Sequence, residues 1–234
     1  MLLLGITNVA IPFFLISWGE QAIDSAVAAI LDATVPLFVI VIAHLALHDD
    51  KITFYKTLGL LVGFAGVVVL MSKDIGASAS PLLGQGAVVL ASMFYAGSSV
   101  YARKTTENTP AVLRSVGPLL SSTAVMWLAT GTVERPMRIP HLPITWIALL
   151  WLGMLGSGFA FILNYYLIHE IGPTRTSMVT YLFPLGGVIL GVSFLGEQLS
   201  WQLITGAVLI IASLAVANFQ PRQQKAAELP TTQP

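Results

Sequence analysis

Asp32 is the residue of this sequence whose type and position suggest chemistry most directly. It lies within an apolar run from about residue 25 to residue 47, roughly seven residues from its start. As part of a helix it would lie about 10 Å deep in a membrane, where a carboxylate costs several kcal/mol unless it is paired or hydrated. Asp32 is therefore predicted to bind a cationic group of a solute or to exchange a proton. The alternatives are a bond to a local hydroxyl such as Thr34, or water reaching the carboxylate from outside.

Pro36 and Pro184 lie inside apolar runs at corresponding places of the chain. Proline has no N–H, so the carbonyl four residues earlier loses its helical donor. The carbonyls affected are those of Asp32 and Thr180. Because such groups are tolerated in a membrane only where protein or water satisfies them, the two prolines predict a hydrated cavity lined at both interruptions. Simple packing kinks are the alternative.

Further candidates are amides and aromatic rings inside or at the ends of the apolar runs. Amides in a membrane hydrogen-bond between helices or reach a solute. Aromatic rings suit the wall of a cavity for an amphipathic solute, with cation–π contact, and Trp18 equally fits the aromatic belt of the membrane interface. The predicted solute-binding residues are Asp32, Pro36, Trp18, Asn8, Tyr166, Asn164, Tyr181 and Pro184. No catalytic residue and no metal ligand is predicted.

The composition defines the elements that must position these residues. Charged residues make up 9% of the chain, against roughly 25% in an ordinary soluble domain, and the mean hydropathy is +0.82. Such a surface must be covered by lipid, where only helices or closed barrels satisfy the backbone. The apolar runs are continuous over about 17–23 residues, the length that crosses a ~30 Å hydrocarbon core. The predicted fold class is an all-α integral membrane protein.

Several classes of function have no support in this composition. The formal net charge is zero and there is no cysteine, which gives no sign of nucleic-acid binding and excludes disulfides and thiolate metal sites. The sequence contains no phosphate-binding loop, no H-E-x-x-H and no G-x-S-x-G. We therefore expect no enzyme and no cofactor, and no ATP-driven step within this chain.

About eight transmembrane helices are predicted, at residues 2–18, 25–47, 54–72, 83–102, 112–131, 144–168, 176–195 and 201–219. Short connections make consecutive helices antiparallel. With the amino terminus in the cytoplasm, eight of the 11 Lys and Arg residues lie on the cytoplasmic side, as the positive-inside rule favours. Both termini are thus predicted to be cytoplasmic, in the cell (inner) membrane. The polar tail, 220–234, is predicted to be disordered.

An internal repeat relates two parts of the chain. Gly206 follows Gly59 by 147 residues, and Ser200 follows Thr53 by the same offset. Both hydroxyl residues are expected to cap the next helix. The repeat predicts a truncated first unit of three helices at 1–75 and a complete second unit of five helices at 82–219. Because five is odd, the units must be inverted, so the chain is expected to be the remnant of a ten-helix inverted repeat of five plus five that lacks its first two helices.

These motifs, in this order, resemble the EamA-type members of the drug/metabolite transporter superfamily. The resemblance covers the chain to about residue 219 and rests on Ala28–Leu31, Thr34–Phe38, Asp49–Thr53, Gly59–Leu70, Leu182–Leu185, Leu195–Ser200 and Gly206. It implies a ten-helix inverted repeat with cytoplasmic termini that exports or exchanges small metabolites. The chain departs from this pattern in lacking two helices and in having Asp50 where the loop acid is usually Glu.

The expected function is secondary transport of a small organic metabolite or drug across the plasma membrane. The alternatives are a non-transporting membrane subunit or receptor, and an inactive truncated transporter fragment. The partners considered are the lipid bilayer, a small organic solute, a coupling proton and a second copy in a homodimer, without nucleic acid. The sequence does not distinguish amino acids, other metabolites and amphipathic toxins as substrates.

Overall fold

The computed structural model describes residues 1–23, 25–72, 82–133, 142–186, 193 and 200–217. These ranges contain helices and connecting turns, and no strand occurs among them. Six helices are long and apolar enough to cross a membrane: Leu2–Gly19, Val27–Ala46, Phe54–Met71, Leu82–Thr105, Val112–Gly131 and Pro143–Ile171. Trp201–Ala217 is a shorter apolar helix. The predicted all-α membrane fold is confirmed; part of the predicted span 176–195 lies outside the described residues.

Several spans are divided into segments of different helical type. The first span comprises α1 (Leu2–Gly5), the π-helix η1 (Ile6–Ala10) and α2 (Ile11–Gly19), and the second comprises α3 (Ser25–Asp32) and α4 (Val35–Ala46). They are followed by α5 (Phe54–Met71), α6 (Leu82–Thr105) and α7 (Ala111–Val133). The next span joins α8 (Pro143–Trp151), the π-helix η2 (Leu152–Phe159) and α9 (Ala160–Ile171). The last elements are α10 (Pro173–Ser177), the 3-10 helix η3 (Met178–Tyr181), a helical stretch at 182–186, and α12 (Trp201–Ala217).

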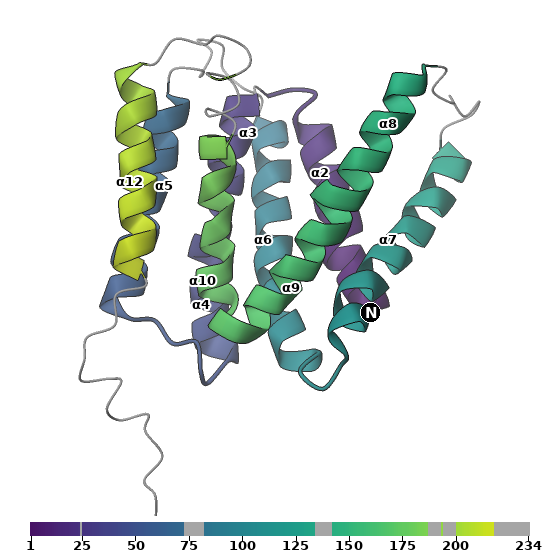
Figure 1. The fold of residues 1–234 in the computed structure, drawn as a ribbon, viewed down its shortest axis with the longest axis horizontal. Coiled ribbons are helices and arrows are strands. Elements are labelled where there is room, and N and C mark those ends of the chain that lie inside the picture. Colours follow the sequence, from purple (N-terminus) through teal and green to yellow (C-terminus); the bar gives the residue numbers. More distant parts are fainter. Residues whose placement is uncertain (24, 73–81, 134–141, 187–192, 194–199, 218–234) are drawn as a thin grey trace, which may run out of the picture.

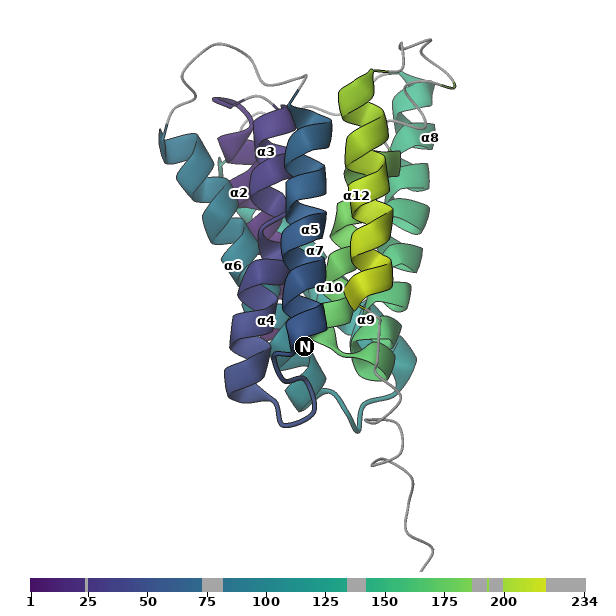
Figure 2. The same ribbon diagram turned by 90° about the vertical axis from the view of Figure 1, so that its left-hand side faces the viewer.

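Consecutive spans run up and down through one bundle (Figure 1). The connections 47–53 and 106–110 and the turn at Gly172 lie at the end that is at the bottom of Figure 1, hereafter the lower end. The amino terminus lies toward this lower end as well. The joined helix α8–η2–α9 crosses the front of the bundle at a tilt, and α12 lies beside α5 in both views (Figures 1 and 2).

Helices α5 and α12 pack antiparallel with very close backbones. A Cβ on Gly59 would lie 2.6 Å from the Cβ of Ala217, and a Cβ on Gly206 would lie 2.5 Å from the Cβ of Leu70. Gly206 follows Gly59 by 147 residues, and Ala217 follows Leu70 by 147 residues. Each residue of the first contact therefore corresponds, through the repeat offset, to a residue of the second contact on the other helix. This exchange is the property of a local two-fold axis between equivalent antiparallel helices, as an inverted repeat requires.

Both predicted helix caps are confirmed. The hydroxyl of Thr53 accepts a hydrogen bond from the backbone N–H of Lys56 at 3.4 Å, before α5. The hydroxyl of Ser200 accepts one from the N–H of Leu203 at 3.4 Å, before α12. Each satisfies one of the N–H groups that a helix start leaves without a partner. The same local device therefore begins the two helices that meet at the local two-fold axis.

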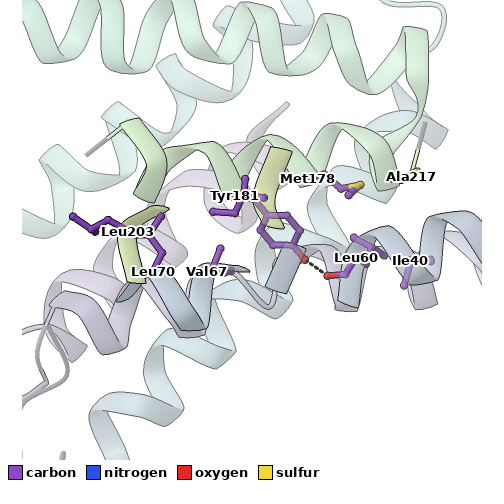
Figure 3. Close-up of a cluster of buried hydrophobic side chains, with 10 residues drawn as sticks. Ile40, Leu60, Val67, Leu70, Met178, Tyr181, Leu203 and Ala217 are labelled. Carbon is purple, nitrogen blue, oxygen red and sulfur yellow. Dashed lines mark hydrogen bonds between the residues drawn. The ribbon is translucent and has the colours of Figure 1, made fainter. Parts of the chain in front are cut away.

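Tyr181 anchors η3 against α5 (Figure 3). Its side chain is fully buried in a cluster with Leu60, Val67 and Met178, and its hydroxyl donates to the carbonyl of Leu60 at 3.2 Å. A buried tyrosine hydroxyl needs such a partner. The close approach of the Tyr181 ring is accommodated by Gly63, where an added Cβ would lie 2.5 Å from the ring. Tyr181 is thus a packing residue that fixes the position of η3.

The outer surface of the bundle is strongly apolar. None of the most apolar window within Pro143–Ile171 is buried, and Trp151 is 70% exposed while Leu150 is 62% exposed. Monomeric soluble proteins rarely expose contiguous apolar surfaces of this kind. The exposed rings and aliphatic side chains are therefore the surface that lipid covers.

Substitution of Gly206 by alanine tests the contact between α5 and α12. Gly206→Ala places a methyl group 2.8 Å from the Gly66 carbonyl, and overpacking of this kind costs about 1–3 kcal/mol. The matched control is Gly86→Ala in α6, because nothing lies within 4 Å of a Cβ there. We expect the melting temperature of the detergent-purified protein to fall for Gly206→Ala and to stay equal or rise for Gly86→Ala. Equal melting temperatures for both variants and the wild type would contradict the described packing.

Candidate functional site

A cavity of about 400 Å³ lies between the helices and is lined from both parts of the repeat. The first part contributes η1, α2 and the junction of α3 and α4, and the second contributes α6, η2, α9, α10, η3 and the stretch at 182–186. Its lining residues are Asn8, Phe13, Asp32, Val35, Tyr95, Ser99, Gly156, Ala160, Phe161, Leu163, Asn164, Leu167, Thr176, Ser177, Val179, Thr180 and Phe183. The lining combines hydroxyl, amide and carboxylate groups with an apolar wall, as small-molecule sites commonly do.

Asp32 lines this cavity at the point where its span is interrupted. It is the last residue of α3, and α4 begins at Val35 with Pro36 in its first turn. The Oδ1 atom of Asp32 is buried and has no hydrogen-bond partner among the described residues. The hydroxyl of Thr34 donates to the carbonyl of Leu31 at 2.6 Å instead. The carboxylate is therefore held at a helix break with one oxygen unsatisfied by the described protein.

The second interruption also borders the cavity. Thr180 lies in the 3-10 helix η3, and Pro184 follows it by four residues. Asp32 and Thr180, which precede Pro36 and Pro184 by four residues, both line the cavity. The rings of Pro36 and Pro184 are not among the lining groups; Pro36 is buried and Pro184 is half-buried.

The two predicted amides, Asn8 and Asn164, both line the cavity. Asn8 lies in the π-helix η1 and donates through Nδ2 to the hydroxyl of Tyr165 at 3.2 Å. The other π-helix, η2, brings Gly156 to the cavity wall. π-Helical segments redirect side chains and are frequent at functional sites, and here each borders the same cavity.

The predicted aromatic residues lie elsewhere. Trp18 and Tyr166 are 45% and 57% exposed, Tyr181 is fully buried, and none of the three lines the cavity. The aromatic rings that do so belong to Phe13, Tyr95, Phe161 and Phe183.

Tyr95 and Ser99 are absent from the residues predicted from sequence, although both line the cavity from α6. They are four residues apart, and Ser92 lies three residues before Tyr95. This spacing places all three on one face of a helix. A polar face within an apolar span was therefore the sequence signal that could have identified them.

A buried carboxylate at the lower end, that of Asp50, pairs with Lys56 and joins the first part of the repeat to the second. Asp50 is 4% exposed; its Oδ1 accepts from Lys56 Nζ at 2.6 Å and its Oδ2 accepts from the backbone N–H of Thr174 at 2.9 Å. Gly172, with φ 85° and ψ 157°, turns the chain from α9 into α10 directly beside this carboxylate. Only glycine readily adopts that backbone conformation. Asp50 therefore holds the start of α10 against the start of α5.

A second contact at the lower end is centred on Arg103. Its guanidinium donates to Asp49 Oδ2 at 2.6 Å and also to the backbone carbonyl of His169. The hydrogen bond from Arg103 holds the pKa of the Asp49 carboxyl below its ordinary value of 3.8. Any stabilisation of the fold by this bond is fully present at pH values above the ordinary pKa. It is lost as the pH falls through the lowered pKa of Asp49, where the carboxylate becomes protonated. We call Asp49, Asp50, Lys56, Arg103, Thr174 and His169 the polar cluster.

Comparisons with known proteins agree with this architecture. A model described as the EamA-like transporter family matches residues 1–72 and 82–219. The uncharacterized transporter YoaV of Bacillus subtilis (strain 168) is 27% identical over 90% of this chain, which spans 72% of YoaV. The uncharacterized inner membrane transporter YedA of Escherichia coli (strain K12) is 27% identical over 85% of this chain, which spans 63% of YedA.

A solved crystal structure shares the fold. Its TM-score is 0.81 at 22% sequence identity, over 92% of this chain and 76% of the other. At that identity the likeness concerns the arrangement of the helices alone.

Adjacent aspartates provide a test of the buried ion pair. Asp50→Ala leaves the ammonium of Lys56 and the N–H of Thr174 without their partner, and removing one member of a buried pair costs about 3–5 kcal/mol. The control is Asp49→Ala, because Asp49 is 56% exposed on its side chain and exposed pairs contribute about 0–1 kcal/mol. We expect a large fall in melting temperature only for Asp50→Ala. Equal effects of the two substitutions would contradict the assigned burial.

Proposed function

The chain belongs to the EamA-like transporter family, and we propose that it is a secondary transporter that exports or exchanges a small organic metabolite or drug across the plasma membrane. One observation carries the proposal: the cavity lies between the two parts of the repeat and is lined by Asp32 and Thr180, at the breaks before Pro36 and Pro184. Transporters built from inverted repeats bind their solutes at such interrupted helices near the membrane midplane.

Within this proposal the predicted residues have different roles. Asp32, Asn8 and Asn164 contact the solute, because they bring polar groups to the cavity. Pro36 and Pro184 act indirectly, by interrupting the helices beside Asp32 and Thr180. Tyr181 acts as a positioning residue through its bond to α5. Trp18 and Tyr166 belong to the outer surface rather than to the binding site.

The distribution of basic residues supports a cytoplasmic lower end. Lys51 lies in the connection 47–53, Lys56 lies in the first turn of α5, and Arg103 and Lys104 lie in the last turn of α6. The positive-inside rule favours the cytoplasm for an end with this enrichment. Both termini are then cytoplasmic in a multi-pass protein of the cell membrane.

Alternating access gives the polar cluster a function. Two of its hydrogen bonds connect loop 47–53 with the second part at the lower end: Arg103 of α6 donates to Asp49, and the N–H of Thr174 in α10 donates to Asp50. Opening the cavity toward the cytoplasm would require these bonds to separate, while the close packing of α5 against α12 continues to join the two parts of the repeat. The two separate family matches, 1–72 and 82–219, support a division into units at 1–75 and 82–219.

A proton or solute gradient would supply the driving force, and Asp32 can exchange the proton.

Efflux from reconstituted vesicles tests this proposal. Proteoliposomes containing the full chain are loaded with a uniformly ¹³C-labelled metabolite extract, and release is followed by mass spectrometry. We expect at least one metabolite to leave faster than from protein-free vesicles, and Asp32→Asn to slow that release roughly ten-fold or more, which corresponds to about 1.4 kcal/mol.

The matched control for this assay is Glu107→Gln. Glu107 is an exposed carboxylate in the connection 106–110, outside the cavity, and its neutralisation should leave the release unchanged. Release no faster than from protein-free vesicles would contradict transport and favour a non-transporting membrane subunit. Full release by Asp32→Asn would remove Asp32 from the mechanism.

A further inference from the structure

We infer that the cavity takes a singly charged organic amine, with the carboxylate of Asp32 as the counter-ion of its ammonium group. The inference rests on the proposed function, in which a solute occupies this cavity, and it adds the chemical class of that solute. Three properties of the lining lead to it: its charge, the direction of its hydrogen bonds, and the character of its apolar wall.

The charge of the lining is a single negative one. Asp32 is the only acidic residue among the described lining residues, and no Lys, Arg or His occurs among them. Lys56 and Arg103 are held at the lower end by Asp50 and Asp49. A buried charge is unfavourable unless it is paired. One carboxylate without a cation therefore favours a solute with one positive charge.

The hydroxyl groups of the lining offer acceptors rather than donors. A hydroxyl has one proton to donate and two lone pairs to accept with. All four serine and threonine hydroxyls that line the cavity donate their proton to a backbone carbonyl three or four residues earlier: Ser99 to Tyr95 at 2.9 Å, and Thr176 to Gly172, Ser177 to Thr174 and Thr180 to Ser177 at 2.8 Å each. Only their lone pairs remain for a solute.

The helix break at Asp32 and one amide add to this excess of acceptors. Pro36 removes the helical donor of the Asp32 carbonyl. The amide group of Asn8 uses one N–H on Tyr165 and keeps its carbonyl oxygen as an acceptor beside its second N–H. N–H and O–H groups come mainly from Asn164 and Tyr95. An ammonium has three N–H donors and no acceptor, so it complements this lining, whereas a solute carboxylate would face Asp32 with no cation among the described lining residues.

The wall around these polar groups is apolar and aromatic. Phe13, Phe161 and Phe183 line the cavity together with Tyr95. Aromatic faces attract ammonium groups and pack against apolar carbon. The volume of about 400 Å³ lies in the lower part of the range for small-molecule sites. The solute is therefore a compact monocation with an apolar or aromatic body.

Three compounds of nearly equal size and different charge test the inference. The probes are 2-phenylethylamine, 2-phenylethanol and 3-phenylpropionate, and their affinities for the detergent-purified full chain are measured by isothermal titration calorimetry at pH 7. We expect the amine to bind at least about ten-fold more tightly than the alcohol, and the propionate to bind most weakly. Asp32→Asn should abolish the preference for the amine over the alcohol while leaving the affinity for the alcohol within about two-fold, and Asp32→Glu and the control Glu107→Gln should retain the preference.

The melting temperature of each variant shows whether it is folded, and Asp32→Glu keeps the test valid if Asp32→Asn does not fold. Equal affinities for the amine and the alcohol, tighter binding of the propionate, or a preference that survives in Asp32→Asn would overturn the inference. Failure of all three probes to bind at millimolar concentration would overturn it as well.

Amine binding with the expected preference but no amine flux in vesicles would contradict transport and leave the inference standing. Flux of neutral or anionic solutes without an amine preference would contradict the inference and leave transport standing.

Discussion

The pairing of backbone polar groups in hydrocarbon is the constraint on which the rest of this structure depends. An N–H or C=O group that lacks a partner in lipid costs several kcal/mol. The chain meets this requirement with apolar helices across its described length. Pro36 and Pro184 interrupt the helical pattern beside Asp32 and Thr180, and both of these residues line the same cavity. At these two positions, irregular backbone borders a region where a solute or water can supply missing partners.

The same constraint explains how the two parts of the repeat are joined. Along their length, α5 and α12 meet through small residues that let the backbones approach closely, with Gly59 against Ala217 and Gly206 against Leu70. At the lower end, Asp50 of the first part accepts from the backbone N–H of Thr174, and Asp49 pairs with Arg103. Apolar contact can slide or tilt at little cost, whereas a buried ion pair either forms or breaks. The cavity between the two parts is therefore bounded by one continuous packing surface and one set of discrete bonds.

The spans were predictable from sequence because their length and hydropathy are local properties. The predicted run 54–72 is the helix Phe54–Met71, and the expected caps at Thr53 and Ser200 are present. The location of the polar cavity residues was predictable in part. Asp32, Asn8 and Asn164 were singled out because polar groups are rare in apolar spans, and all three line the cavity.

Aromatic residues could not be placed in the same way. A tyrosine or tryptophan in an apolar span suits the lipid surface, the packed core and a cavity wall equally well. Tyr166 lies on the outer surface and Tyr181 lies in the core, whereas Tyr95 lines the cavity. The rotation of each helix about its axis decides among these positions, and that rotation depends on packing between helices rather than on local sequence.

Water access to the cavity from a lipid bilayer tests the central claim most directly. The chain contains no cysteine, so a single thiol can be placed at Ser99, which lines the cavity, or at Leu61, which is 54% exposed on the outer face of α5. The two positions have similar depth, because Ser99 lies six residues before the end of α6 and Leu61 lies seven residues after the start of α5. With a membrane-impermeant maleimide applied to both sides of proteoliposomes, the account predicts rapid labelling of Ser99→Cys and little labelling of Leu61→Cys. Equal protection of both thiols would contradict a hydrated cavity between the two parts of the repeat.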